Sequence, residues 1–133
     1  MRKWMMGAVL AVGLASSAVA QGTEIEGVIG NQIEAFKADD FASAFEFASP
    51  SIRGMFQTPE NFGRMVTQGY PMVWRPAEVT YLGLRQEDGA YFQTVRIVDA
   101  EGNVHLLDYR MLETADGWKI NGVQVLRAAG ISA

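Results

Sequence analysis

The chain has 133 residues, enough for one domain, with 11 basic and 15 acidic side chains and a net charge of −4. It has no cysteine, which excludes disulfides and thiolate chemistry, and its one histidine, His105, excludes a multi-histidine zinc site within one chain. An acidic chain has no broad electrostatic attraction for nucleic acid or anionic lipid. We therefore expect no metal, no cofactor and no nucleic-acid partner.

Residues 1–20 have the three-part pattern of a secretory signal peptide. Arg2 and Lys3 give a basic start, Met5 to Ala15 is apolar, and small residues lead to an A-x-A ending at Ala20. The apolar run is shorter than the about 20 residues that a membrane-spanning helix needs. Cleavage after Ala20 would leave nine basic and fifteen acidic residues, a net charge of −6. We expect a periplasmic or secreted protein without stable membrane insertion.

The remaining residues, 21–133, are predicted to form a single domain that begins with helices. Thr23, followed three residues later by Glu26, forms a capping box. Apolar residues then recur at helical spacing on one face. These residues are Ile25, Val28, Ile29, Ile33 and Phe36.

Further helix starts follow. Asp39 or Asp40 opens a second helix. Ser49-Pro50 and Thr58-Pro59 each place a hydroxyl side chain at the N-cap and a proline at the first helical position. They predict helices from Pro50 to about Phe56 and from Pro59 to Gly69. The next segment, Tyr70 to Pro76, contains two prolines and is predicted to be extended, as a short edge strand or a lip.

From Ala77 onward, apolar residues recur with the spacing typical of β-strands rather than of helices. Turn signals at Asp88-Gly89, Ala100 to Gly102 and Asp116-Gly117 divide residues 77–127 into four strands of a meander. Three or four helices followed by an antiparallel sheet of four or more strands define an α+β domain.

The turns also fix which side chains share a face of the sheet. The predicted inner face, against the helices, contains Leu82, Leu84, Val95, Ile97, Leu107, Tyr109, Met111, Trp118 and Ile120. Val123 and Val125 are out of phase with Trp118, so we expect a bulge at Asn121-Gly122 that returns them to this face.

The opposite, outer face mixes apolar and charged side chains. Its predicted members are Val79, Tyr81, Phe92, Thr94, Arg96, Val98, Val104, Leu106, Asp108, Arg110 and Leu112. A surface of this kind is typical of a contact site. We expect a homodimer through Tyr81, Phe92, Arg96, Leu106, Asp108 and Arg110, with Arg96 and Asp108 as a diagonal ion pair. The alternative is a solvated face on which the charges pair across strands.

Three segments of the sequence are similar to those of a known protein family. They are RGMFQTPENFGRMVTQGYPMVWRP, VDAEGNVHLLDYRM and DGWKINGVQVL, with the landmarks F-x-x-M-V-x-x-G-Y-P, D-Y-x-M and D-G-W-x-I-x-G-V. From about Ile25 to Leu126 the chain resembles a bacterial family known as domain of unknown function 4864. That family is similar to the nuclear transport factor 2-like (cystatin-like) group. The resemblance implies a conical α+β roll with helices in the hollow of a curved sheet, often dimeric and often with a pocket at the wide end, and it implies no activity.

Tyr70, Met72 and Trp74 are expected at the mouth of such a cone. With Gln93 and Tyr109 below them, they would line a small apolar cavity with a few polar anchors, or else plug the cone. Our first hypothesis is a non-enzymatic domain that binds a small apolar ligand, through Tyr70, Trp74, Gln93 and Tyr109, or a protein partner.

Two alternatives stay open. An isomerase or lyase would need a carboxylate base inside the cone, and Tyr109 would act with a base that the sequence does not identify. Glu113 points inward only beside a turn, and Asp108 points outward. His105 lies three residues before Asp108, on the opposite face, and is expected at the surface or rim. A purely structural homodimer is the other alternative.

Overall fold

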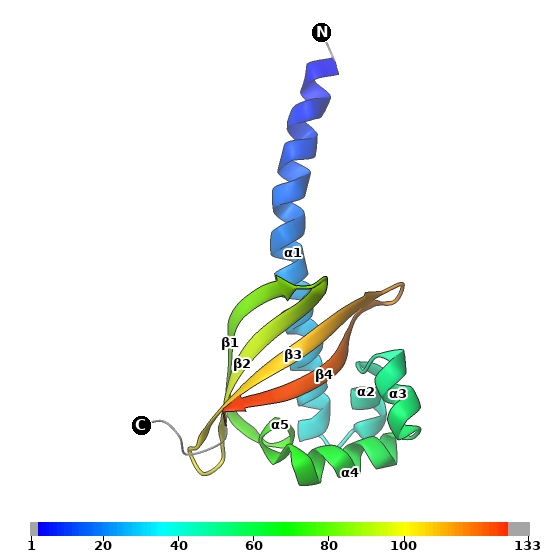
Figure 1. The fold of residues 1–133 in the computed structure, drawn as a ribbon, viewed down its shortest axis with the longest axis vertical. Helices are drawn as coiled ribbons and strands as arrows, with labels where there is room; N and C mark the ends of the chain where they lie inside the picture. The colour runs from blue at the N-terminus through cyan, green and yellow to red at the C-terminus, as the bar shows by residue number, and fades with distance from the viewer. Residues whose placement is uncertain (1–2, 128–133) are drawn as a thin grey trace.

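The computed structural model describes residues 3–127 (Figure 1). The helices are α1 (Lys3–Lys37), α2 (Phe41–Glu46), α3 (Pro50–Phe56), α4 (Pro59–Gly69) and α5 (Pro71–Trp74). The strands are β1 (Pro76–Glu87), β2 (Ala90–Asp99), β3 (Val104–Thr114) and β4 (Gly117–Arg127). Arg2 of the predicted signal peptide and residues 128–133 of the predicted domain lie outside the described residues.

The strands form one curved antiparallel sheet in the order β1-β2-β3-β4, and the helices pack against one side of it. In Figure 1, α1 runs behind the sheet and continues past its end, while α2 to α5 gather at the other end of the molecule. The predicted α+β class is therefore confirmed. In the described part of the chain, no helix combines the length and the apolar character that crossing a bilayer requires.

Helix α1 provides the central apolar stripe of the core. Ile25, Ile29, Ile33 and Phe36 are each at most 3% exposed, which confirms the face predicted from their spacing. The expected start at Thr23 is wrong for the full-length chain, because the helix continues from Lys3 through that residue without a break. The predicted cleavage point after Ala20 thus lies within α1.

The predicted caps of the shorter helices are confirmed. The side chains of Asp40, Ser49 and Thr58 accept hydrogen bonds from the backbone N–H groups of the residues three positions later, at the starts of α2, α3 and α4. Proline occupies the first turn of α3 and of α4, as expected.

The segment after α4 differs from the prediction. Residues Pro71–Trp74 form a single helical turn, α5, rather than an edge strand or a lip. A proline restricts the residue before it, and Tyr70 and Arg75, which precede the two prolines, are both non-helical. The four residues between them are free to turn, with Pro71 in the first position.

The predicted hairpin registers hold for the central strands. Glu87 pairs with Ala90 across the Asp88-Gly89 turn, and Ile97 pairs with His105. In the last hairpin, the side chains lie on the predicted faces of the sheet, but the register differs from the predicted one by two residues. Glu113 rather than Ala115 pairs with Trp118. The predicted bulge in β4 is present, since Arg110 pairs with Gly122 and the next residue, Met111, pairs with Ile120.

Strand β1 departs from the prediction. A bulge at Leu82-Gly83 separates the Tyr81–Val95 pair from the Leu84–Gln93 pair, so residues before the bulge change face. Tyr81 and Val79 therefore point toward the helices and contact the core, although we expected them on the outer face. Leu82 is 46% exposed instead of inward.

Candidate functional site

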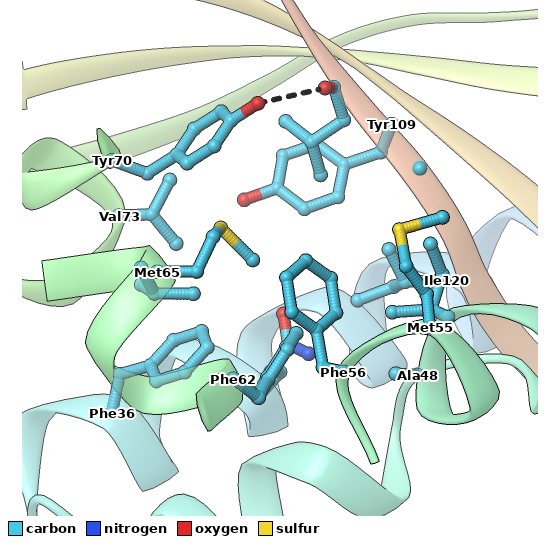
Figure 2. Close-up of a pocket in the computed structure, with 15 residues that line it drawn as sticks. Phe36, Ala48, Met55, Phe56, Phe62, Met65, Tyr70, Val73, Tyr109 and Ile120 are labelled. Carbon is cyan, nitrogen blue, oxygen red and sulfur yellow. Dashed lines mark hydrogen bonds between the residues drawn. The ribbon is translucent and has the colours of Figure 1, made fainter. Parts of the chain in front are cut away.

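The molecule has an apolar cavity where α3 and α4 arch over the sheet (Figure 2). Its volume is about 320 Å³. Side chains from α1, α3, α4 and α5 form one side, and β3 and β4 form the other. The lining consists of Gln32, Phe36, Ala48, Ile52, Met55, Phe56, Phe62, Met65, Val66, Tyr70, Val73, Tyr109, Ile120, Gly122 and Val123. None of these described lining residues carries a formal charge.

The wall formed by α3 is fixed to the sheet by backbone and side-chain hydrogen bonds. Ser49 donates its N–H to the Ile120 carbonyl at 2.8 Å, and Ile120 donates to the carbonyl of Phe47 at 2.8 Å. The Ser49 hydroxyl, fully buried, donates to Asn121 Oδ1 at 2.6 Å and also caps α3. The start of α3 is therefore held against the middle of β4, in register with the bulge.

Aromatic rings close the helical side of the cavity. Phe62 of α4 contacts the rings of Phe36, Phe45 and Phe56, with ring centroids 5.3 to 5.9 Å apart. Such tilted and edge-on pairs favour a fixed arrangement of the rings. The cavity lies between this aromatic cluster and the sheet (Figure 2).

Tyr109 of β3 provides the most unusual polar group of the cavity. The residue is 0% exposed, and its hydroxyl has no hydrogen-bond partner among the described residues. Burial, together with the nearby hydroxyls of Tyr81 and Tyr70, raises the pKa of Tyr109 well above its usual range. The hydroxyl is thus a neutral donor at physiological pH, and leaving it unpaired costs about 1–3 kcal/mol.

Two other polar side chains of the lining, Tyr70 and Gln32, each donate one hydrogen bond within the protein. Tyr70 donates its hydroxyl to the Val123 carbonyl over a long 3.4 Å, drawn as the dashed line in Figure 2. Gln32, 3% exposed, donates its amide Nε2 to the carbonyl of Ala44 at 3.1 Å. Two of the four predicted ligand-binding residues, Tyr70 and Tyr109, therefore meet in one cavity.

The other two predicted ligand-binding residues, Trp74 and Gln93, do not line the cavity. Trp74 donates its indole N–H to Asp39 Oδ1 at 2.8 Å, and Arg75 donates to the same oxygen at 3.0 Å. These two bonds lower the pKa of Asp39. Gln93, 1% exposed, donates its amide to the carbonyls of Leu82 and Gly83 in the β1 bulge. Both side chains have structural partners rather than cavity positions.

Sequence reasoning missed most of the apolar lining. Ile52, Met55 and Phe56 were recognised only as the length of a short helix, and Phe62, Met65 and Val66 only as a helix face. The available signal was that α4 has a strongly apolar face, of which Phe62 and Val66 are buried and Met65 is only partly covered.

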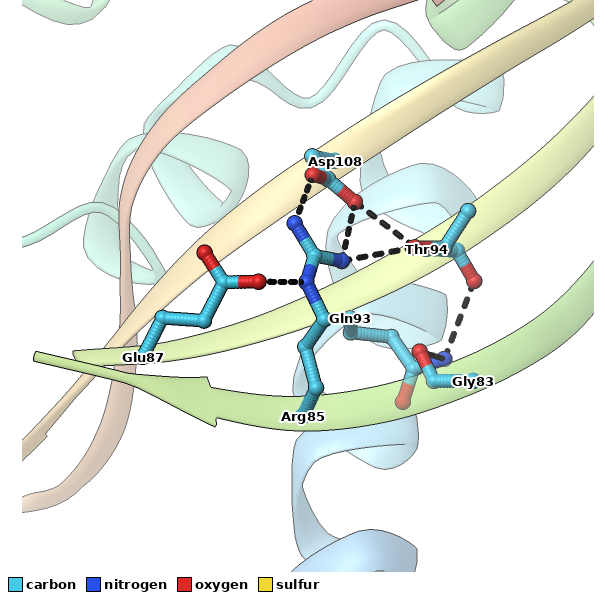
Figure 3. Close-up of polar contacts among 6 residues, drawn as sticks. All are labelled: Gly83, Arg85, Glu87, Gln93, Thr94 and Asp108. Atoms are coloured by element: carbon cyan, nitrogen blue, oxygen red, sulfur yellow. Dashed lines mark hydrogen bonds and ion pairs between the residues drawn. The ribbon is translucent and has the colours of Figure 1, made fainter.

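The outer face of the sheet carries a polar network that differs from the prediction (Figure 3). Asp108, 5% exposed, accepts two hydrogen bonds from Arg85, at 3.1 and 2.5 Å, and one from the Thr94 hydroxyl at 2.7 Å. The bonds from Arg85 hold the pKa of Asp108 below its ordinary value, against the effect of burial. The expected Arg96–Asp108 pair is therefore wrong, and Arg96 lies 3.6 Å from Glu78 instead.

The remaining residues of the predicted outer face are placed as follows. Phe92, Leu106 and Arg110 lie on that face, and the guanidinium groups of Arg85 and Arg110 are 5.1 and 5.8 Å from the Phe92 ring. Tyr81 lies on the helix side, where its hydroxyl donates to the Glu26 carbonyl at 3.2 Å.

The predicted position of His105 is also wrong. It is 6% exposed rather than at the surface, and its Nε2 lies 2.9 Å from Asp99 Oδ2. Asp99 also accepts from the N–H groups of Glu101 and Asn103, and these bonds, with that from His105 first, lower its pKa. This group stabilises the β2–β3 turn. As expected, His105 does not bond Asp108, because Asp108 is bound by Arg85 and Thr94 on the other face.

The fold and the cavity define a class of protein: a small α+β domain whose helices pack on one side of a curved sheet, with an apolar pocket between the two layers. Residues 18–133 match the family model described as a domain of unknown function (DUF4864), and the chain belongs to that family. No curated protein and no solved structure matches the chain. The family predicted from the three sequence runs is thus confirmed.

Proposed function

We propose that this protein is an exported, non-enzymatic domain that binds a small apolar molecule in the cavity between α3, α4 and the sheet. The observation that carries the proposal is an apolar cavity of about 320 Å³ with one buried, unpartnered hydroxyl, that of Tyr109. Small-molecule sites have this character: mostly apolar walls, a few placed polar groups and volumes from about 300 Å³ upward.

Binding of a ligand in the cavity is expected to be energetically favourable. A ligand that covers the apolar lining removes surface from water, worth about 25 cal/mol per Å². It also offers the Tyr109 hydroxyl a partner that the folded chain does not supply. The wall formed by α3 is held to β4 by the hydrogen bonds of Ser49.

The proposal has two further parts, one that rests on the sequence and one that rests on the fold. The pattern of residues 1–20 supports export to the periplasm or secretion, with cleavage after Ala20. The curved sheet with helices on one side supports membership of the nuclear transport factor 2-like group. Mass analysis of the exported protein tests the first part: a chain that still begins at Met1 would contradict it.

Binding is favoured over catalysis because the lining within residues 3–127 includes no carboxylate and no histidine that would act as a base toward a substrate near Tyr109. The isomerase or lyase alternative would need its base from outside this cavity. It predicts turnover of a bound compound, which product analysis after binding would detect.

The binding proposal is tested by a thermal-shift screen against lipids, sterols and aromatic metabolites. A ligand that binds only the folded state at about 100 times its Kd adds about 2.7 kcal/mol to the free energy of unfolding. The variant Ile52→Trp, which fills the cavity, should lose the shift, and Leu82→Trp, at an exposed position in the β1 bulge, should keep it. Equal shifts in both variants would place the ligand elsewhere.

We also propose that two copies associate through the outer face. Phe92 and Leu106 are only half-buried there, and Leu112 is 40% exposed. Light scattering at micromolar concentration should give twice the mass of one mature chain, and Leu106→Glu should halve that mass, while Met55→Glu, at a 68% exposed position of α3 on the helix side, leaves it unchanged. A single-chain mass for the unmodified protein would refute this association, and it would leave ligand binding unaffected.

A further inference from the structure

We propose that the molecule held in the cavity is uncharged and carries one hydrogen-bond acceptor, such as a carbonyl oxygen, placed against the Tyr109 hydroxyl. This inference rests on the proposed binding function and adds the chemical class of the ligand. Three observations support it: the unpaired hydroxyl, the lack of charge in the described lining, and the hydrogen bonds that Tyr70 and Gln32 already donate within the protein.

The Tyr109 hydroxyl is fixed in place. Tyr109 lies in the middle of β3, paired with Gln93 of β2 and Val123 of β4, so its backbone has ladder partners on both sides. Figure 2 shows the ring lying along the sheet with its oxygen directed into the cavity, on the side of Val73 and Met65. The hydroxyl is buried and has no partner among the described residues, so an acceptor held in the cavity would supply one.

The polar groups around it determine how many acceptors a ligand needs. The Tyr70 hydroxyl is directed at the Val123 carbonyl, and the Gln32 amide N–H is directed at the Ala44 carbonyl. Among the described lining side chains, this leaves the Tyr109 hydroxyl as the donor without a partner. One acceptor on an otherwise apolar molecule therefore gives this hydroxyl its partner.

The charge of the ligand follows from the lining. No lysine, arginine or histidine of the described chain lines the cavity, so a carboxylate would lose its hydration and gain one hydrogen bond. Burying an ion without a counter-ion costs far more than burying a hydrogen-bonded neutral group. A free fatty acid or an aromatic carboxylate is thus disfavoured, and the corresponding ketone or ester is favoured.

A set of nearly isosteric probes tests this class. Ethylbenzene, acetophenone and benzoate share a ring and differ by having no acceptor, a neutral acceptor or an anion, and 2-ethylnaphthalene, 2-acetonaphthone and 2-naphthoate repeat the series at a larger size. Their Kd values are measured by two-dimensional NMR titration on the wild-type protein, Tyr109→Phe and Tyr91→Phe. Tyr91 lies outside the cavity and serves as the matched control.

The ketone of at least one series should bind the wild-type protein about three to ten times more tightly than Tyr109→Phe, the range expected for one hydrogen bond. The hydrocarbon should bind both proteins about equally, the carboxylate should bind weakest, and Tyr91→Phe should behave as wild type. Tightest binding by a carboxylate, or equal ketone affinity in the wild-type protein and Tyr109→Phe, would overturn the ligand class and leave cavity binding intact. Failure of every probe in both series to perturb cavity residues would overturn both proposals.

Discussion

Replacing Tyr109 by phenylalanine should stabilise the ligand-free protein, although most substitutions in a core destabilise. The change removes one oxygen atom and keeps the ring that packs between the sheet and the helices. That oxygen is buried without a partner, and an unsatisfied buried polar group costs about 1–3 kcal/mol. Because the oxygen leaves only a very small space behind, we expect a net gain of about 1 kcal/mol and a rise in Tm of about 4 °C.

The matched control is Tyr81→Phe. Tyr81 contacts the same core, but its hydroxyl donates to the Glu26 carbonyl at 3.2 Å, so the substitution leaves a helix carbonyl with one bond fewer. It should cost about 0.5–1.5 kcal/mol. Urea titrations followed by circular dichroism measure both values on ligand-free protein. A loss of stability in Tyr109→Phe equal to that in Tyr81→Phe would mean that the Tyr109 hydroxyl is bonded, and the reasoning about the cavity would be wrong.

Two further predictions concern the outer face and helix packing. Arg85 lowers the pKa of Asp108 in the folded state, so this carboxylate stabilises the fold above its ordinary pKa of 3.8 and loses the effect as the pH falls below that value. Urea unfolding should show Asp108→Asn less stable than wild type by about 1.5–3 kcal/mol at pH 7, with a smaller difference at pH 3; a difference independent of pH would contradict the pairing. Gly63→Ala should destabilise, because a Cβ there would lie 2.7 Å from the Phe41 ring, whereas Gly27→Ala, with open space around it in α1, should stabilise by about 1 kcal/mol. Thermal melts compare the two, and equal effects would contradict the packing.

The structure could be predicted from the sequence where it depends on residues that are close together in the chain. The N-caps before prolines and the Asp88-Gly89 turn each depend on a few adjacent residues, and each was correctly predicted. The bulge in β4 was also predictable, because Val123 and Val125 change phase with a glycine just before them.

The bulge in β1 was not predictable in the same way. Leucines flank Gly83 on both sides, and Val79 and Tyr81 precede it in the other phase, so the run reads as a regular strand in either register. In the structure, the amide of Gln93 on the neighbouring strand donates to both carbonyls of the bulge. Gln93 lies ten and eleven residues after these two positions, so the local pattern of β1 contains no sign of this contact.

The candidate site shows the same limit. Tyr70 and Tyr109 were identified as lining residues because aromatic residues near the mouth of a sheet are typical of pockets. Whether a space exists between them depends on how far α3 and α4 lie from the sheet, and this is set by contacts between residues far apart in the chain, such as Ser49 with Asn121. The charge network of Asp108 was missed for the same reason, since Arg85 reaches it from another strand.

The hydrogen bond from Ser49 to Asn121 joins residues 72 positions apart, and the walls of the cavity come from opposite ends of the domain. Such distant contacts form late when a chain folds, because the loop between them must close first. During synthesis, we therefore expect the apolar faces of the helices in residues 41–74 to stay exposed to solvent until the final hairpin has formed. The interval before β4 is complete is when this chain is most exposed to aggregation, and when a chaperone would be of most use to it.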